Sequence, residues 1–133
     1  MTHLETKLKI GSWDEKPYRE LPDGRKFTRA DVTLSVADKE IEAEATSESL
    51  TYYAADGTAT YVGLMHIDGK LGGRSGSFVL HNVGRYDGTE ASGRFEIVPG
   101  SGTGELAGIS GSGSSVSTHA DYPNMPLTLD YEL

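Results

Sequence analysis

The sequence contains no cysteine. It therefore cannot form a disulfide, a thiolate nucleophile, an iron–sulfur cluster or a cysteine-ligated zinc site. Basic residues are also few, since 12 Lys and Arg stand against 20 Asp and Glu and give a net charge of −8. Proteins that bind nucleic acids or dock on anionic membranes need a basic surface, so we expect neither kind of partner.

Long apolar runs are absent as well. No stretch approaches the roughly 18 apolar residues of a membrane-spanning helix, and the first ten residues, MTHLETKLKI, lack the apolar core of a secretory signal. We therefore expect a cytoplasmic protein. The length of 133 residues is that of one domain, 1–133, long enough to bury a core without disulfides.

What the sequence does have is strict alternation of apolar and polar residues. This pattern predicts strands with one face on a core and one in water. Four runs show it clearly, and four further segments between turn signals bring the total to about eight strands. The clear runs are 4–10, 30–36, 91–97 and 127–133, and the further segments are 41–53, 58–67, 75–86 and 110–118.

Helical patterns are limited to single turns, one near Glu105–Ala107 and one at Tyr18–Leu21 within the charged segment 14–27, which we expect to be a loop. Antiparallel strands with one long connection favour a closed barrel, because closure removes exposed sheet edges. The predicted fold is all-β: a single closed antiparallel barrel of about eight strands, wide enough for side chains or one small ligand.

Two glycine-rich stretches carry a resemblance to a known family. They are GKLGGRSGSFVLH at 69–81 and VPGSGTGELAGISG at 98–111, and SWDE at 12–15 and LTLDY at 127–131 accompany them. Together they resemble an uncharacterised bacterial family of small barrels classed with the allene oxide cyclases. The resemblance implies an eight-stranded barrel with a cavity, often a homo-oligomer. No motif matches the catalytic residues of allene oxide cyclases, so none are carried over.

The segment 41–53 changes its pattern partway. Its apolar residues first occupy odd-numbered positions, at Ile41, Ala43 and Ala45, and then even-numbered ones, at Leu50 and Tyr52. A bulge between residues 45 and 50 would account for the change. If the bulge precedes Glu48, that carboxylate points into the barrel, where burial would raise its pKa and suit it to acid or base catalysis. If the bulge follows it, Glu48 faces water.

Aromatic and histidine side chains on the strands are candidate ligand contacts. These are Tyr52, Tyr61, His66, His81, Phe95 and Tyr131. His66 and His81 would lie opposite each other only if the intervening hairpin turned on two residues near Gly73-Arg74, and no third ligand accompanies them. We therefore predict no metal and no cofactor.

Two functions compete on these grounds. A barrel with an open cavity would bind a compact hydrophobic small molecule and could isomerise or cyclise it through Glu48. A barrel filled by side chains would instead be a non-catalytic oligomeric scaffold or interaction protein. In either case the segments 58–67 and 75–86 are apolar on both faces, which predicts a covering subunit and hence a homo-oligomer, with a dimer favoured.

Overall fold

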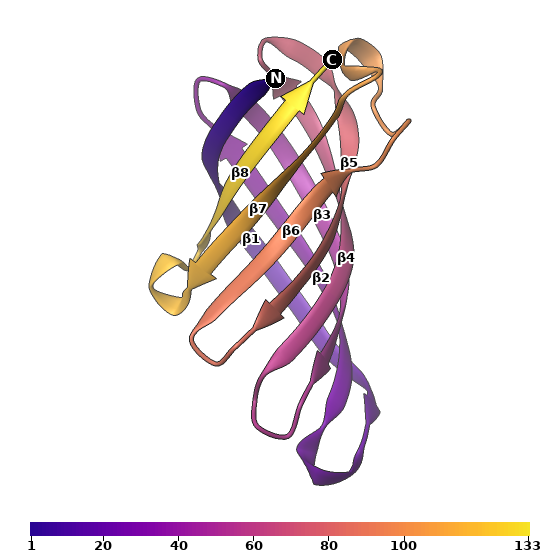
Figure 1. Ribbon diagram of the computed structural model, residues 1–133, viewed down its shortest axis with the longest axis vertical. Coiled ribbons are helices and arrows are strands. Elements are labelled where there is room, and N and C mark those ends of the chain that lie inside the picture. Colours follow the sequence, from indigo (N-terminus) through magenta and orange to yellow (C-terminus); the bar gives the residue numbers. More distant parts are fainter.

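The computed structural model describes residues 1–133 and shows a closed barrel of eight antiparallel strands, each paired with its neighbours in sequence (Figure 1). This confirms the predicted fold. The strands are β1 (Thr2–Glu20), β2 (Lys26–Ala37), β3 (Ile41–Tyr53), β4 (Ala59–Leu71), β5 (Arg74–Tyr86), β6 (Glu90–Ile97), β7 (Ser110–Thr118) and β8 (Asn124–Glu132). Three 3-10 turns, η1 (Pro22–Gly24), η2 (Gly104–Leu106) and η3 (His119–Asp121), complete it.

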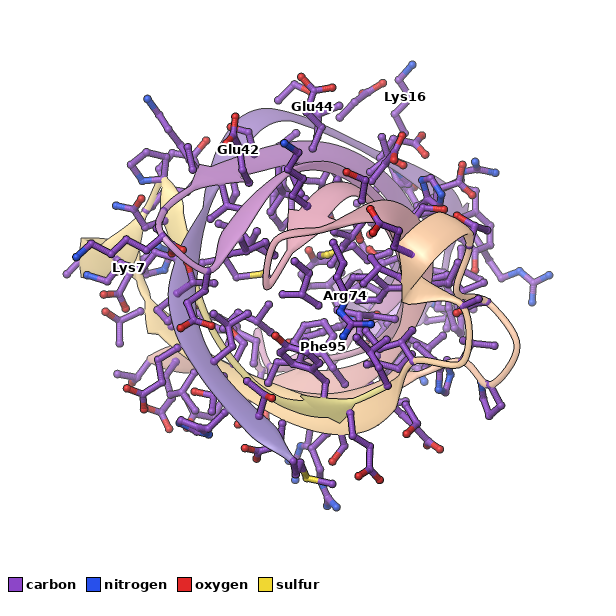
Figure 2. All side chains as sticks on the ribbon, turned by 90° about the horizontal axis from the view of Figure 1, so that it is seen from above. Lys7, Lys16, Glu42, Glu44, Arg74 and Phe95 are labelled. Carbon is purple, nitrogen blue, oxygen red and sulfur yellow. The ribbon has the colours of Figure 1, made fainter.

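Alternation along the strands sorts side chains between the inside and the outside of the barrel. Seen from above, Phe95 lies within the ring of strands, whereas Lys7, Lys16, Glu42 and Glu44 lie outside it (Figure 2). Lys7 has an odd residue number and Lys16 an even one, yet both belong to β1 and both lie on the outside of the barrel. The strand must therefore change face between them.

That change of face occurs at Gly11. The pairing of β1 with β2 shifts between Ile10 and Ser12, which is a β-bulge. Before the bulge the even residues of β1 face inward. From the bulge to a second register shift, between Pro17 and Arg19, the odd residues do, so Trp13 and Glu15 pair with the inner-face residues Val32 and Ala30 of β2. The expected loop over 14–27 is wrong: the charged residues continue β1 and β2 as a long hairpin that turns at η1.

The packed core fills the end of the barrel that carries both chain termini (Figure 1). The largest fully buried side chains include Leu4, Leu8, Phe78, Leu80 and Leu129. Large aliphatic and aromatic side chains on the inner faces of neighbouring strands therefore close this end.

The glycine-rich loop 98–109 caps the same end. β5 pairs with β6 from Leu80 onward, and the part of β5 before Leu80 is hydrogen-bonded to this loop instead. Thr103 N of the loop donates to Ser77 O at 2.9 Å, and Val79 N of β5 donates to Ser101 Oγ of the loop at 3.1 Å. A Cβ on Gly76 would lie 2.1 Å from Thr103 O, so the loop approaches closely only because glycine stands there. The motif thus serves the architecture of the barrel.

The outer face of β3, β4 and β5 carries a cluster of exposed apolar side chains, which we call the outer apolar patch. Its members are Leu50, Val62, Leu64 and Val83, with exposed fractions between 45% and 53%. Leu50 pairs with Val62 and Val62 with Val83, so the patch is contiguous across three strands. Leu80 does not belong to it, because its side chain is fully buried inside the barrel.

Candidate ligand cavity

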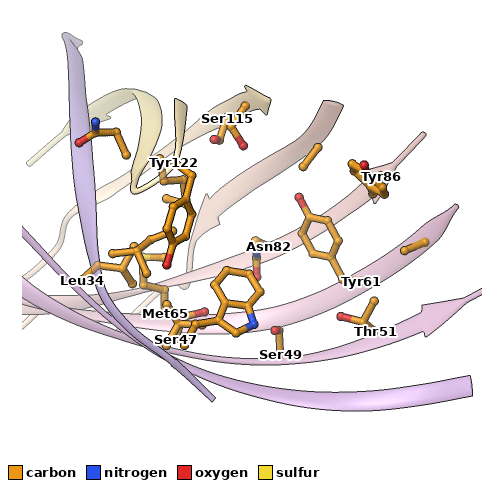
Figure 3. A pocket seen from close by; sticks show the side chains of 18 of the residues that line it. Leu34, Ser47, Ser49, Thr51, Tyr61, Met65, Asn82, Tyr86, Ser115 and Tyr122 are labelled. Carbon is orange, nitrogen blue, oxygen red and sulfur yellow. The ribbon is translucent and has the colours of Figure 1, made fainter. Parts of the chain in front are cut away.

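The half of the barrel away from the termini is hollow. A cavity of about 270 Å³ lies there, within the end formed by the β1–β2, β3–β4, β5–β6 and β7–β8 connections (Figure 3). Interiors contain few voids much larger than a water molecule, so a space of this size is not ordinary packing. It is slightly smaller than the pockets of roughly 300–1,000 Å³ that hold drug-sized ligands, and so suits a compact molecule.

The cavity wall combines aromatic rings with hydroxyl groups and contains no charged side chain. The rings are those of Trp13, Tyr53, Tyr61, Tyr86, Phe95 and Tyr122. The hydroxyls are those of the tyrosines and of Ser47, Ser49, Thr51, Ser115, Ser117 and Thr118. Because no cation or anion lines the wall, the cavity offers no partner to a charged ligand and would strip it of water.

The serine and threonine residues of β3 that line the cavity explain why the apolar pattern of this strand changes partway. The strand is regular throughout: every residue from Ile41 to Tyr53 pairs in unbroken register with β4. Ile41, Ala43 and Ala45 face the core, and the same inner face continues as Ser47, Ser49 and Thr51, where the core gives way to the cavity. The bulge predicted between residues 45 and 50 is therefore wrong.

The inward orientation considered for Glu48 is wrong for the same reason. Its side chain is 71% exposed on the outer surface, and its Oε1 lies 3.5 Å from Arg29 Nη2. A carboxylate in bulk solvent lacks the burial that would adapt it to acid or base chemistry in the cavity.

Asn82 is the most unusual group in the wall. Its side chain is only 8% exposed, and its Oδ1 is buried without any hydrogen-bond partner. Gly63 on the adjacent strand makes room for it, since a Cβ there would lie 2.9 Å from this oxygen. Buried carbonyl oxygens are nearly always paired, so this unpaired oxygen weakens the ligand-free barrel.

Tyr61 stands near Asn82 in the same wall (Figure 3). Its ring lies over two glycines, because a Cβ on Gly84 would lie 2.2 Å from Tyr61 Cζ and one on Gly93 would lie 3.0 Å from its Oη. Burial raises the pKa of the Tyr61 hydroxyl above its ordinary value. The hydroxyl is therefore protonated at neutral pH and can donate a hydrogen bond.

The barrel has an interior carboxylate, but it is Glu15 rather than Glu48. Tyr53 Oη donates to Glu15 Oε2 at 2.5 Å, Thr28 Oγ1 donates to the same oxygen at 2.7 Å, and Trp13 Nε1 donates to Oε1 at 3.0 Å. Trp13 and Tyr53 both line the cavity. Glu15 thus holds two aromatic walls in place.

Electrostatics keep Glu15 ionised. Burial alone would raise the pKa of its carboxyl group, but the hydrogen bonds from Tyr53, Thr28 and Trp13 outweigh burial and hold the pKa below its ordinary value of 4.5. Burial and the bond to Glu15 together raise the pKa of Tyr53 to about 12. The carboxylate therefore accepts hydrogen bonds at neutral pH and has no proton to give.

Two of the six candidate ligand contacts, Tyr61 and Phe95, line the cavity. The other four do not. His66 and His81 are exposed on the outer face, where they pair with Val79 and Leu64 respectively rather than with each other. Tyr52 also lies outside, with its ring centroid 5.2 Å from that of Phe27, another outer-face residue. Tyr131 is buried at the capped end, below the turn at Gly72.

Sequence reasoning missed Trp13, Glu15 and Asn82 as cavity-related residues. The signal for the first two was Gly11, a glycine within an alternating strand, where the register of β1 against β2 shifts and the inward positions change from even to odd numbers. Asn82 continues the series of alternate residues Phe78 and Leu80, which face the barrel interior. The sequence therefore showed a polar side chain at an inward position.

No three His, Asp or Glu side chains lie together in a way that could hold a metal ion. The barrel also has no helix with the length and apolarity to span a membrane.

Comparison with known sequences assigns the family. The family described as "Protein of unknown function (DUF3224)" matches residues 4–131. This chain belongs to the DUF3224 family. The match confirms the expectation of an uncharacterised family, whereas the link to allene oxide cyclases rests on the sequence resemblance alone.

A solved structure supports the same assignment. The DUF3224 barrel is similar to the crystal structure of a protein with unknown function from the DUF3224 family of Shewanella oneidensis MR-1. The two chains are 30% identical with a TM-score of 0.80, and the similarity covers 100% of this chain and 97% of the other. No curated protein matches this DUF3224 chain.

The Glu15 network predicts a pH-dependent stability difference. A carboxyl group whose pKa is depressed in the folded state stabilises the fold above its unfolded pKa, and this contribution is lost as the pH falls through the folded pKa. We expect Glu15→Gln to lower the free energy of unfolding by about 1–3 kcal/mol at pH 7. Urea denaturation should show this difference shrinking below the ordinary pKa of 4.5. Glu42→Gln, on the outer face, is the control, and an equal loss in both variants would contradict the assigned role.

The unpaired Asn82 oxygen predicts a stabilising substitution. Asn82→Leu keeps the branched shape and removes a buried polar atom without a partner, so we expect the free energy of unfolding of the ligand-free protein to rise by about 1–3 kcal/mol. Asn124, whose side chain is exposed at the cavity mouth, is the matched control, and its change to Leu should stay within about 0.5 kcal/mol. A destabilised Asn82→Leu protein would show that the amide is satisfied in solution.

Proposed function

We propose that this protein binds a compact, uncharged small molecule with an apolar ring system in the barrel cavity. The observation that carries the proposal is the change along the barrel from a packed core to a hollow half lined by aromatic rings and hydroxyls without a charge. The resemblance of residues 69–81 and 98–111 to allene oxide cyclase-like barrels supports it, because that resemblance implies a cavity.

The alternative of a scaffold with a filled barrel has less support. Eight strands fix the barrel width, and a filled interior needs large inward side chains along its whole length. Here the inner face of β3 carries Ser47, Ser49 and Thr51, which are too small to fill it. Small inward residues in one half of the barrel favour a binding role.

The geometry favours binding over isomerisation or cyclisation. Glu15 contacts the wall residues Trp13 and Tyr53, and its oxygens are already engaged as acceptors from these two residues and from Thr28. Burial raises the pKa of Tyr61 above its ordinary value of 10.0, so the hydroxyl keeps its proton at neutral pH and cannot accept one as a general base. We therefore propose a carrier or sensor of the small molecule.

Ligand-observed NMR with a panel of indole, 2-naphthol, borneol and camphor tests the proposal. At least one of these uncharged ring compounds should bind the wild-type protein, and Ser115→Phe, which fills the cavity from β7, should reduce binding at least about tenfold. Ser112→Phe places the same ring on the outer face of β7 and should leave binding unchanged. The proposal fails if no compound binds, or if Ser115→Phe binds as the wild type does.

We also propose that a second copy of this chain covers the outer apolar patch. Charges beside the patch favour such self-association. On β6, Arg94 pairs in register with Val83 and Glu96 with His81, so a two-fold axis across the strands would set each copy's Arg94 against the other's Glu96. The same axis would set Val62 against Leu64 at the centre of the patch, with Val83 against His81 on one side and Leu50 against Glu48 on the other.

Light scattering at tens of micromolar protein tests this second proposal. We expect a dimer for the wild type and a monomer for Leu64→Glu, because a charge within the patch would have to be desolvated without a partner. Ser112→Glu, on a strand outside the patch, should remain dimeric. A monomeric wild type would refute the proposal.

A further inference from the structure

We propose that the cavity selects a flat ring whose polar groups lie at two opposite edges, one facing the hydroxyls of β3 and the other facing those of β7. This inference rests on the proposed binding function and names the class of molecule bound: a compact, uncharged ring with two polar substituents far apart. Rings that carry the same substituents side by side would bind less tightly.

The first support is the arrangement of the strands. In the closed order from β1 to β8, three strands separate β3 from β7 in either direction, so these two strands face each other across the interior. Ser47, Ser49 and Thr51 of β3 lie along one side of the cavity, and Ser115 of β7 lies on the opposite side (Figure 3). Ser117 of β7 also lines it. The cavity therefore has two hydroxyl-bearing walls that face each other.

The second support is that a molecule in the cavity can reach these hydroxyls. Ser47, Ser49, Thr51 and Ser117 belong to the inner faces of their strands, yet each is half-buried, because the cavity borders it. Ala45, on the same inner face of β3 but beside the packed core, is buried. The exposed surface of the serines and the threonine is thus surface of the cavity.

These hydroxyls are also free to bind. Other hydroxyls at this end of the barrel are engaged within the protein, since Thr118 Oγ1 donates to Asp121 Oδ2 and Tyr53 Oη donates to Glu15 Oε2. The serine hydroxyls of the two walls take part in no such side-chain hydrogen bond. A ligand can therefore pair with them without breaking a bond inside the barrel.

The walls between β3 and β7 are mainly apolar. Met65 and Phe95 line one of them, and Trp13, Val32 and Leu34 line the other. The faces of a flat ring can lie against these two walls, which leaves its edges to meet the hydroxyls. Because an eight-stranded barrel is just wide enough for one small ligand, a ring that fits contacts both hydroxyl walls at once.

The position of the polar groups decides the selection, whether they donate or accept. A serine or threonine hydroxyl can do both, so it can pair with either an O–H or a carbonyl of the ligand. A ring with a polar group at each of two opposite edges satisfies both walls. A bare hydrocarbon edge would instead cover the hydroxyls of one wall and remove them from water without a partner.

The isomers 2,6-dihydroxynaphthalene and 2,3-dihydroxynaphthalene form a matched pair of probes. They share one uncharged ring system and two hydroxyls, which lie at opposite ends in the first and side by side in the second. Isothermal titration calorimetry measures both affinities. We expect the wild type to bind the 2,6 isomer about tenfold or more tightly than the 2,3 isomer. The mono-alcohol 2-naphthol should also bind more weakly than the 2,6 isomer.

Removing the hydroxyls of β7 tests which residues carry the preference. The double variant Ser115→Ala with Ser117→Ala keeps the shape of this wall and removes its hydroxyls, so it should lose the preference for the 2,6 isomer. The control Ser112→Ala with Ser114→Ala removes two hydroxyls from the exposed outer face of the same strand and should keep the preference. Thermal unfolding confirms that both variants are folded.

The outcomes separate this inference from the binding function. Equal affinities for the two isomers in the wild type, or tighter binding of the 2,3 isomer or of 2-naphthol, would overturn the inference and leave the binding function intact. A preference that persists in the double variant of Ser115 and Ser117 would also overturn it. If neither isomer nor any ring compound of the panel binds the wild type, the binding function itself fails.

Discussion

The fixed width of an eight-stranded closed barrel is the constraint on which the rest of this structure depends. Once β1 pairs with β8, the interior has a set diameter, and only the size of the inward side chains decides whether it is full. At the capped end leucines, isoleucines and Phe78 fill it. At the other end serines and threonines cannot reach the axis, and the remaining space is the cavity.

The same alternation makes the cavity wall sensitive to a single backbone irregularity. Gly11 turns β1 by one residue, and in doing so it brings Trp13 and Glu15 to the inner face. Without that bulge both side chains would lie in water, and Tyr53 would lose its hydrogen-bond acceptor. The aromatic lining of the cavity thus depends in part on one glycine within β1.

The sequence predicted the number of strands, the closed barrel and the inward positions of Tyr61 and Phe95, because each depends only on alternation and turn residues. It misplaced Glu48 because a change from Ala45 to Ser47 on one face looks the same, in pattern, as a change of face. The positions of His66 and His81 depended on the turn, which is formed by Gly72 and Gly73, so the pairing of Leu71 with Arg74 fixes the register. Asn82 required three-dimensional contacts, since only they show that its oxygen has no partner.

Stability and binding oppose each other at the cavity. An empty, partly apolar space forgoes packing contacts that an occupant would restore, and the buried Asn82 oxygen forgoes a hydrogen bond, so both features weaken the free protein. A chain under selection for stability alone would fill this half of the barrel, as it fills the other. We take the retained space as the mark of a binding site.

A crystal structure of the protein grown with borneol tests this account most directly. The account predicts the bicyclic ring inside the barrel, in contact with the aromatic side chains of Trp13 and Tyr61. A cavity that holds only water under these conditions, or a ring bound on the outer surface of the barrel, would contradict it.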